Sequence, residues 1–171
     1  MRALVVYESM FGNTADVARS VADGLAATFD VTVADVPDLP PVQDTDLLVV
    51  GAPTHAFGLS RPGTRADAAQ HGQVRAGAGQ TGIREYLART TALNATPVAA
   101  FDTKVNKAFV PGSAARKALR LLRGLGGRPV LPAESFRVTD MTGPLVAGEL
   151  DRAHRWGRAV AAAAQKLPQR A

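Results

Sequence analysis

Short strand-like segments alternate along this chain with segments in which apolar residues recur at helical spacing. The strand-like segments cover residues 3–7, 31–36, 46–51, 97–101 and a stretch within 128–138. Several of them are almost wholly apolar, which is typical of strands buried on both faces, as in a parallel sheet. The strand–helix order repeats about five times, which predicts a parallel sheet with helices on both faces and right-handed crossovers.

Helical periodicity follows most of the predicted strands. The first helix is expected after the loop that ends near residue 13, with Asn13 or Thr14 as its cap. Further helices are expected over 82–89, after Ser113 and over 149–165. The last of these is expected to bury one stripe, made of Leu150, Ala153, Gly157, Val160 and Ala164.

Three loops follow strands at the edge where such a sheet binds ligands. Ligands of open parallel sheets lie beyond the carboxyl ends of the strands, at the switch in strand order. The loops after the first, third and fourth predicted strands are therefore the places to search. The third strand is followed by a long connection over 52–79, with a short helix expected near 64–70, and the fourth by a loop over 102–111. Loops this long in compact domains are often functional.

The loop after the first strand has the composition of a phosphate site. It consists of Ser9, Met10, Phe11, Gly12, Asn13 and Thr14. Backbone N–H groups at a helix N-terminus can hold a phosphate, the hydroxyl and amide side chains add donors, and Gly12 permits close approach. The alternative is an ordinary capped loop, in which small polar residues are also expected.

The pattern strand–Ser-x-x-Gly-Asn-Thr–helix resembles the FMN phosphate loop of the flavodoxin family. Phe11 stands where many members carry a further Thr. The resemblance implies one flavodoxin-like domain over 1–171, with a frayed tail at 166–171. It also implies an α/β fold with a doubly wound, five-stranded parallel sheet in the order 2-1-3-4-5, helices on both faces, and FMN as cofactor.

The other two loops extend the resemblance. The family's segment after the third strand lies against the flavin, which implies contacts from Pro53, Thr54, His55, Ala56, Phe57 and Gly58. The family's next loop offers backbone groups to the pyrimidine edge of the flavin, which implies roles for Asp102, Thr103 and Lys104. The Gly, stacking Tyr and Cys usual in that loop are absent here, and Phe109 is the available aromatic substitute.

The composition excludes several classes of functional site. The 171 residues contain no cysteine, which excludes disulfides, thiolate metal sites and thiol catalysis. The three histidines, His55, His71 and His154, are isolated, so no metal site is expected. No apolar run approaches the length of a membrane span or a signal peptide, and a cytoplasmic protein is expected. Residues 77–82 match G-x-G-x-x-G, but no strand precedes them, as a dinucleotide site requires.

The formal net charge of +5 adds one further hypothesis. Nucleic-acid binding is not expected, because no recognised motif accompanies the charge. One predicted helix face carries Arg116, Lys117, Arg120 and Arg123. It is either a solvated face or a docking patch for a redox partner with an acidic surface. Cations are also expected around the flavin ring, where they would raise its reduction potential: Arg61, Arg65, Lys104 and Lys107.

Three functions remain open at this point. The principal prediction is an FMN-binding electron carrier. The second is an NAD(P)H-dependent FMN enzyme that reduces a quinone or another small molecule. The third is a flavin-free interaction module with a flavodoxin-like fold. The oligomeric state is not predicted.

Overall fold

The computed structural model describes residues 1–108 and 111–167 and is built on one parallel sheet. Its strands lie in the order β2-β1-β3-β4-β5, with β6 also pairing with β4, and every paired strand is parallel. They are β1 (Arg2–Tyr7), β2 (Asp30–Asp35), β3 (Leu47–Pro53), β4 (Pro97–Val105), β5 (Arg128–Pro129) and β6 (Glu134–Val138). The predicted parallel sheet and its strand order are confirmed.

Two strand boundaries differ from the sequence prediction. The fifth strand, expected within 128–138, is divided into β5 and β6, which pair with successive parts of β4. Pro129 and Pro132 lack the N–H group that a continuous ladder needs, which accounts for the break. β4 continues to Val105 rather than ending at Phe101, so Asp102, Thr103 and Lys104 belong to a strand and not to a loop.

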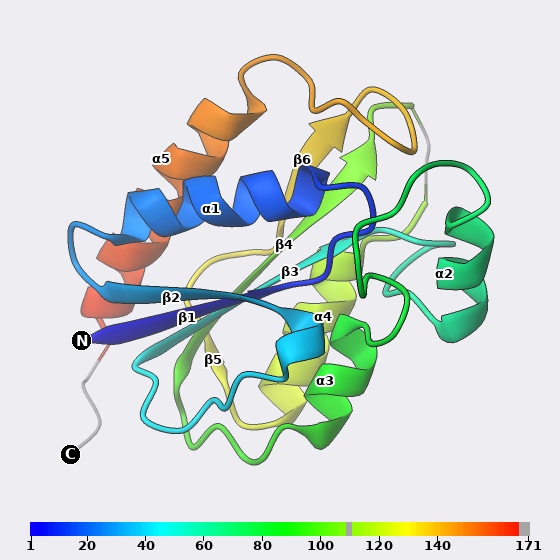
Figure 1. Ribbon diagram of the computed structural model, residues 1–171. Coiled ribbons are helices and arrows are strands. Elements are labelled where there is room, and N and C mark those ends of the chain that lie inside the picture. Colours follow the sequence, from blue (N-terminus) through cyan, green and yellow to red (C-terminus); the bar gives the residue numbers. More distant parts are fainter. Residues whose placement is uncertain (109–110, 168–171) are drawn as a thin grey trace.

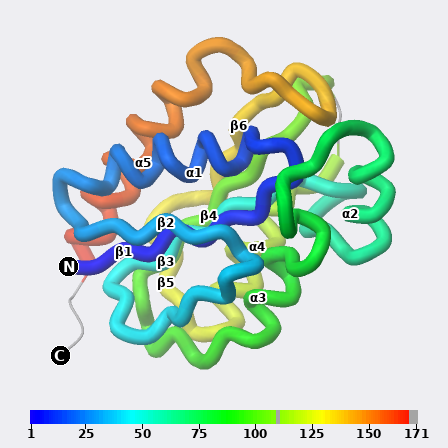
Figure 2. Tube along the Cα trace, viewed as in Figure 1, coloured from blue at the N-terminus to red at the C-terminus, as the bar shows by residue number. Residues whose placement is uncertain are grey.

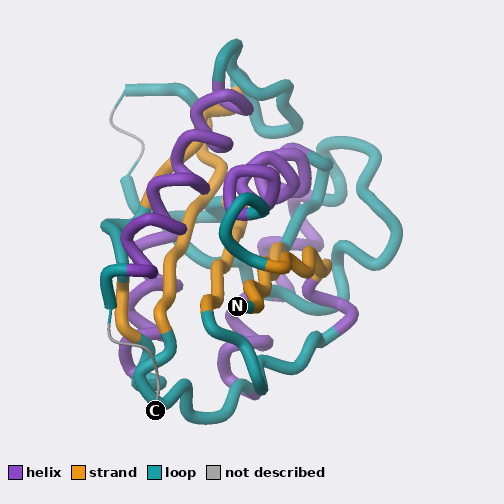
Figure 3. Tube along the Cα trace, turned by 90° about the vertical axis from the view of Figure 1, so that its left-hand side faces the viewer, coloured by secondary structure: helices purple, strands orange, loops and turns teal. Residues whose placement is uncertain are grey.

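Helices cover both faces of the sheet, as expected (Figure 1). α1 (Asn13–Leu25) and α5 (Glu149–Gln165) pack on one face, while α3 (Ile83–Arg89) and α4 (Ala114–Gly124) contribute to the core on the other. A short 3-10 helix, η1 (Val36–Asp38), follows β2. Figure 2 shows the same layers as a chain trace, and the side view in Figure 3 places the strands between the helices.

The core between the sheet and the α1–α5 pair contains a cluster of three aromatic rings. Phe101, Phe136 and Trp156 form a mutual edge-to-face cluster with centroids 6.0 to 6.1 Å apart. Trp156 lies outside the apolar stripe predicted for the last helix, whereas Leu150, which was expected inside, is exposed. The buried face of α5 is therefore rotated toward Trp156 and Ala161.

The helices α1 and α5 pack closely against each other near the C-terminal end of α1. Gly24 and Gly157 face each other across this contact: a β-carbon at Gly24 would lie 2.2 Å from the His154 carbonyl oxygen, and one at Gly157 would lie 2.3 Å from that of Val21. Only glycine permits so close an approach of two backbones.

The carboxyl ends of β1, β3, β4 and β6 meet at one edge of the sheet. Strand order reverses between β1 and β3, and α1, which follows β1, lies on the opposite face of the sheet from α3 and α4. α2 (Pro62–Ala68) stands at this edge beside the loop after β1 (Figure 1). It packs through Ala68 in a small separate cluster with Met10 and Ala78.

The predicted frayed tail at 166–171 is described only in part. The N–H groups of Lys166 and Leu167 donate to the carbonyls of Ala163 and Ala164 at 3.3 and 3.2 Å, and so extend the last turn of α5. Residues 168–171 lie outside the described residues.

Candidate functional site

The loop between β1 and α1 is organised around the Ser9 hydroxyl. Ser9 Oγ accepts hydrogen bonds from the backbone N–H groups of Gly12 at 3.1 Å and Ala15 at 3.3 Å. Gly12, rather than the expected Asn13 or Thr14, is the N-cap of α1, with φ 101° and ψ −22°. A β-carbon there would meet nothing within 4 Å, so the loop opens outward at this residue.

The side chains of the first two residues of α1 hold the helix end in place, and the backbone N–H groups of the same residues are available as donors. Thr14 Oγ1 lies 2.8 Å from Thr103 Oγ1 on β4, and Asn13 Nδ2 donates to the Thr142 carbonyl at 3.0 Å. The first N–H groups of a helix have no intrahelical acceptor. Within the described residues, no acceptor takes the N–H groups of Asn13 and Thr14. The arrangement suits an anion at the positive end of the helix dipole.

A cleft of about 210 Å³ opens beside this helix end at the β1/β3 switch point. Ten residues proposed from the sequence line it: Ser9, Met10, Phe11, Asn13, Thr14, Pro53, Thr54, His55, Ala56 and Thr103. Six lining residues were not foreseen: Thr64, Asp67, Ala68, Val105, Val138 and Met141. The structure thus brings together the loops after β1 and β3, the end of β4, α2 and the loop after β6.

Five of the proposed residues do not line the cleft: Gly12, Phe57, Gly58, Asp102 and Lys104. Gly12 shapes the helix end. Asp102 is fully buried, and its Oδ2 accepts from Thr54 Oγ1 at 3.1 Å, Ser113 Oγ at 2.6 Å and the Ala115 N–H at 3.0 Å. It therefore ties the loop after β3 to the start of α4. Its Oδ1 has no donor among the described residues.

The loop after β3 contains a tight turn at residues 55–58. His55 and Gly58 exchange backbone hydrogen bonds of 2.8 and 2.7 Å, and the two residues between them have positive φ, 33° at Ala56 and 74° at Phe57. Ala56 faces the cleft, while the Phe57 side chain is 60% exposed outside it. Phe109, the aromatic substitute expected from the sequence, lies outside the described residues.

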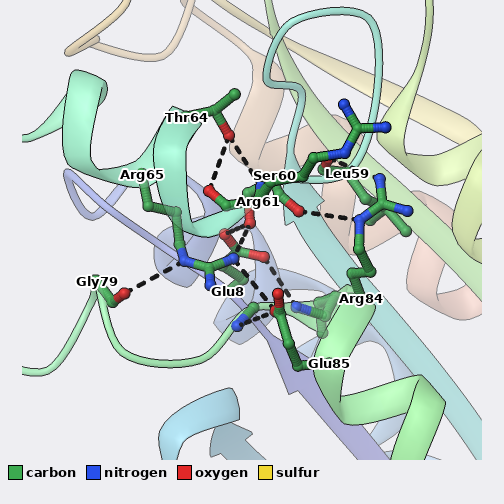
Figure 4. Close-up of polar contacts among 11 residues, drawn as sticks. Glu8, Leu59, Ser60, Arg61, Thr64, Arg65, Gly79, Arg84 and Glu85 are labelled. Atoms are coloured by element: carbon green, nitrogen blue, oxygen red, sulfur yellow. Dashed lines mark hydrogen bonds and ion pairs between the residues drawn. The ribbon is translucent and has the colours of Figure 1, made fainter.

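A buried polar network beneath the cleft holds α2 in place (Figure 4). Glu8 and Arg65 each have a relative exposure of 1%. Ser60 Oγ donates to Glu8 Oε1, the Ile83 N–H donates to Glu8 Oε2 at 2.9 Å, and Arg65 Nη1 donates to Ser60 Oγ at 2.8 Å. The network thus joins the residue after β1, the segment before α2, α2 itself and the start of α3.

The same arginine is also paired with a second carboxylate. Arg65 Nη1 contacts Glu85 Oε2 at 3.2 Å, and Arg65 Nε donates to the Gly79 carbonyl at 3.3 Å. Burial opposes the ionisation of Glu85, but the Arg65 and Gly82 bonds dominate and lower its pKa. Burial raises the pKa of Glu8, against the lowering effect of Ser60 and the Ile83 N–H. No sequence motif pointed to this network, because its members are distant in the chain.

Charge inside the cleft differs from the expectation. Arg61, Lys104 and Lys107 do not line the cleft, and Arg65 is already paired with Glu85 in the buried network. Of the described lining residues, only Asp67 and His55 are titratable. Burial, together with the Arg65 charge, lowers the pKa of His55, which the Thr64 backbone and Asp67 only partly oppose. His55 is accordingly neutral at pH 7.

The lowered pKa of His55 predicts a specific loss of stability in acid. A histidine whose folded-state pKa is depressed stabilises the fold above its unfolded pKa, about 6.5, and that contribution is lost as pH falls toward the folded-state value. Wild type is therefore expected to lose stability between pH 7 and 5 relative to His55→Gln, which has no such proton to bind. Chemical denaturation of both proteins across this range tests it. Parallel pH profiles would contradict the prediction.

The sheet order and the cleft at its switch point define the chain as a flavodoxin-like α/β protein. The sequence model of the flavodoxin family matches residues 5–106, which include β1 through β4 and the first two loops of the cleft. The chain belongs to the flavodoxin family. A comparison with curated protein sequences gives no match.

Solved structures show the same fold along the whole chain. A flavodoxin from the domain Archaea is 20% identical with a TM-score of 0.69, and the alignment covers 96% of this chain and 99% of that one. Oxidised flavodoxin 1 from Bacillus cereus is 16% identical with a TM-score of 0.68, covering 98% and 100%. A flavodoxin WrbA-like protein from Agrobacterium tumefaciens is 19% identical with a TM-score of 0.59, covering 96% and 98%.

Other classes of site find no support in the part of the chain that the structure describes. No three His, Asp or Glu side chains there gather into a metal site. None of its helices is long and apolar enough to cross a membrane. The G-x-G-x-x-G segment at 77–82 precedes α3 and follows turns rather than a strand.

Proposed function

We propose that this protein binds FMN in the cleft and carries electrons between redox partners. The observation that supports it most is the free pair of N–H donors at the start of α1, which opens beside hydroxyl groups and an apolar cleft. Asn13 and Thr14 supply the N–H groups, and Ser9 organises the loop. The family supports the same cofactor.

The residues present fit a flavin mononucleotide. A single phosphate would be held by the N–H donors and by the hydroxyl and amide side chains of Thr14 and Asn13, with the α1 dipole supplying the positive end. Apolar side chains line the rest of the cleft, as a flat aromatic ring requires: Met10, Phe11, Ala56, Ala68, Val105, Val138 and Met141. FMN would supply the redox chemistry, and this chain would hold it, orient it and tune its potential.

Asp67 is the residue through which the cleft sets the potential. It is the only acidic side chain among the described residues that line the cleft. A carboxylate that lines the cleft would oppose the negative charge that bound FMN gains on reduction. Asp67→Asn is therefore expected to raise the FMN reduction potential by tens of millivolts. Spectroelectrochemical titration measures this change, and Asp151→Asn on α5, remote from the cleft, is the control. An unchanged or lowered potential would contradict the role of Asp67.

One experiment separates a carrier from a stand-alone reductase. The FMN-loaded protein is mixed with NADH or NADPH and a quinone, with and without an added flavin reductase. A carrier turns over only through the added reductase. Sustained consumption of NADH or NADPH without it would assign the protein to the quinone-reducing enzymes. Failure to take up FMN would leave the flavin-free interaction module as the remaining hypothesis.

A further inference from the structure

An exposed aromatic side chain stands beside the cleft, among cations that form no ion pair within residues 1–108 and 111–167. We infer that this surface, which comprises Phe57, Arg84, Lys104, Lys117 and the exposed face of α4, docks a redox protein with an acidic surface. The inference rests on the proposed function for the nature of the partner. It names the side of the molecule through which electrons would enter or leave.

The turn that carries Phe57 has a strained backbone. Positive φ is unfavourable for residues with a β-carbon, and a bulky side chain at φ 74° is a clear outlier. Turns with two such residues are normally built from Asn and Gly. The sequence instead places Phe57 at the tip with 60% of its surface exposed. Strain that persists in a binding loop is commonly functional, and here its product is an exposed aromatic ring.

The turn is also held by a close contact with the backbone of Gly112. A β-carbon at Gly112 would lie 2.1 Å from the Phe57 carbonyl oxygen, so the two backbones are in direct contact. A rigid aromatic anchor loses little conformational entropy on binding. Phe57 is adjacent to Ala56, which lines the cleft, so a protein bound over Phe57 covers the cleft mouth.

Three cations from three different elements surround the turn. The Lys117 side chain packs on Gly58, where a β-carbon would lie 2.6 Å from Lys117 Nζ. Arg84 of α3 donates to the carbonyls of Ser60 at 3.2 Å and Leu59 at 3.1 Å, and Lys104 Nζ donates to the Gly112 carbonyl at 2.6 Å. None of the three forms an ion pair within the described residues. Backbone carbonyls position Arg84 and Lys104 and leave their charges unneutralised.

The basic character of the chain is concentrated in the segment that contains Lys104, Lys117 and α4. The segment 103–133 contains seven of the 20 Lys and Arg residues and none of the 15 Asp and Glu residues. The remainder of the chain therefore has 13 cationic and 15 acidic residues. On α4, Arg116, Arg120 and Arg123 are exposed, and Leu121 adds apolar surface that is 41% exposed. A one-sided charge of this kind steers an oppositely charged partner into a defined orientation.

The arrangement favours a protein over a nucleic acid. Protein interfaces concentrate their binding energy in a few aromatic and Arg anchors, surrounded by a polar rim. Phe57 with its ring of cations has this form. Nucleic-acid binding depends mainly on contacts to phosphates. An isolated exposed aromatic side chain contributes to it only where bases stack on the ring.

The test uses a plant-type ferredoxin, an acidic one-electron protein, as the probe. Its binding to the full chain, with and without FMN, is measured by isothermal titration calorimetry at low and at raised ionic strength. We expect salt-sensitive binding that Phe57→Ser and Arg120→Glu each weaken by about tenfold. Arg155→Glu on α5, an exposed arginine on the opposite face of the sheet, makes the same charge change and is expected to leave the affinity within about twofold.

Several results would overturn the inference. They are absence of ferredoxin binding, equal losses in Arg120→Glu and Arg155→Glu, unaltered binding by Phe57→Ser, or tighter binding of duplex DNA than of ferredoxin at the same ionic strength. Phe57→Gly relieves the strained turn, so it should raise the midpoint of thermal unfolding while it weakens ferredoxin binding. That pair of effects excludes misfolding as the cause of the loss.

A separate FMN titration keeps the two proposals apart. Phe57→Ser is expected to bind FMN as wild type does, since Phe57 does not line the cleft. Loss of FMN affinity in that variant would place Phe57 in the flavin site and overturn the docking role. If wild type fails to bind FMN, the proposed function fails. Binding of ferredoxin to the FMN-free protein that still depends on Phe57 would then support the docking surface alone.

Discussion

Replacing Arg65 by methionine is expected to lower the free energy of unfolding by about 3–5 kcal/mol, a large share of the stability of a typical domain. Arg65 is almost completely buried and is the only cation that contacts the Ser60 hydroxyl and the Glu85 carboxylate within the described residues. Its removal leaves Glu85 without its ion pair and Glu8 without its nearest positive charge. α2 is expected to loosen, because the arginine ties it to Gly79 and Glu85.

The control for this variant is Arg61→Met. Arg61 is an exposed arginine at the start of the same helix, and its side chain makes no ion pair within the described residues. A change of at most about 0.5 kcal/mol is expected there. Denaturant unfolding followed by circular dichroism measures both variants. Equal effects of the two substitutions would show that the buried network does not support the fold.

The loss caused by Arg65→Met should also depend on pH. Burial already raises the pKa of Glu8, and removal of the nearby cation raises it further. A carboxyl group with a raised pKa stabilises the folded state below its unfolded pKa, and that contribution disappears as pH rises through the folded-state pKa. The variant should therefore be least impaired in mild acid. Adding Glu8→Gln to Arg65→Met should restore part of the stability at pH 8, since no buried charge then remains on residue 8.

Gly12→Val is expected to weaken FMN binding by more than about 100-fold, equivalent to roughly 2.7 kcal/mol, while the sheet stays folded. At φ 101° a β-branched residue is strained, so the helix end must shift and its N–H donors lose their common direction. The new side chain also enters the open space beside the loop, where a phosphate would lie. FMN fluorescence titration measures the affinity, and circular dichroism monitors the fold.

Gly124→Val is the matched control for this substitution. Gly124 is exposed at the end of α4, its φ is not in the left-handed region, and a β-carbon there meets nothing within 4 Å. The same replacement at that position is expected to leave FMN affinity unchanged. A Gly12→Val protein that binds FMN as wild type does would show that the loop after β1 is not the phosphate site.

The strands and their order could be predicted because buried parallel strands have a conspicuous sequence pattern. Ala3 to Tyr7 and Leu47 to Gly51 are apolar without interruption and pair with each other in register. The loop after β1 was recognisable for a related reason, since its Ser, Gly, Asn and Thr lie within six consecutive residues. Ten of the cleft-lining residues are ones proposed individually from the sequence.

The remaining features depend on contacts between distant residues. β4 could not be followed beyond Phe101, because the next residue is a carboxylate, and only the fold shows that Ser113 and the α4 N-terminus satisfy it. Thr64, Asp67 and Ala68 enter the cleft because a buried Arg65–Glu85 pair fixes α2. Trp156 lies off the helical stripe, but the gap between Phe101 and Phe136 accommodates its ring.

The most direct test of the proposed cofactor site is a comparison of FMN with riboflavin, which has the same ring and ribityl chain but no phosphate. Each is titrated into the purified apoprotein, and the dissociation constant is obtained from flavin fluorescence. If the N–H groups and hydroxyls at the start of α1 hold the phosphate, FMN binds at least about 100-fold more tightly than riboflavin, and Gly12→Val removes most of that difference. Equal affinity for the two ligands, or binding of neither, would contradict the account.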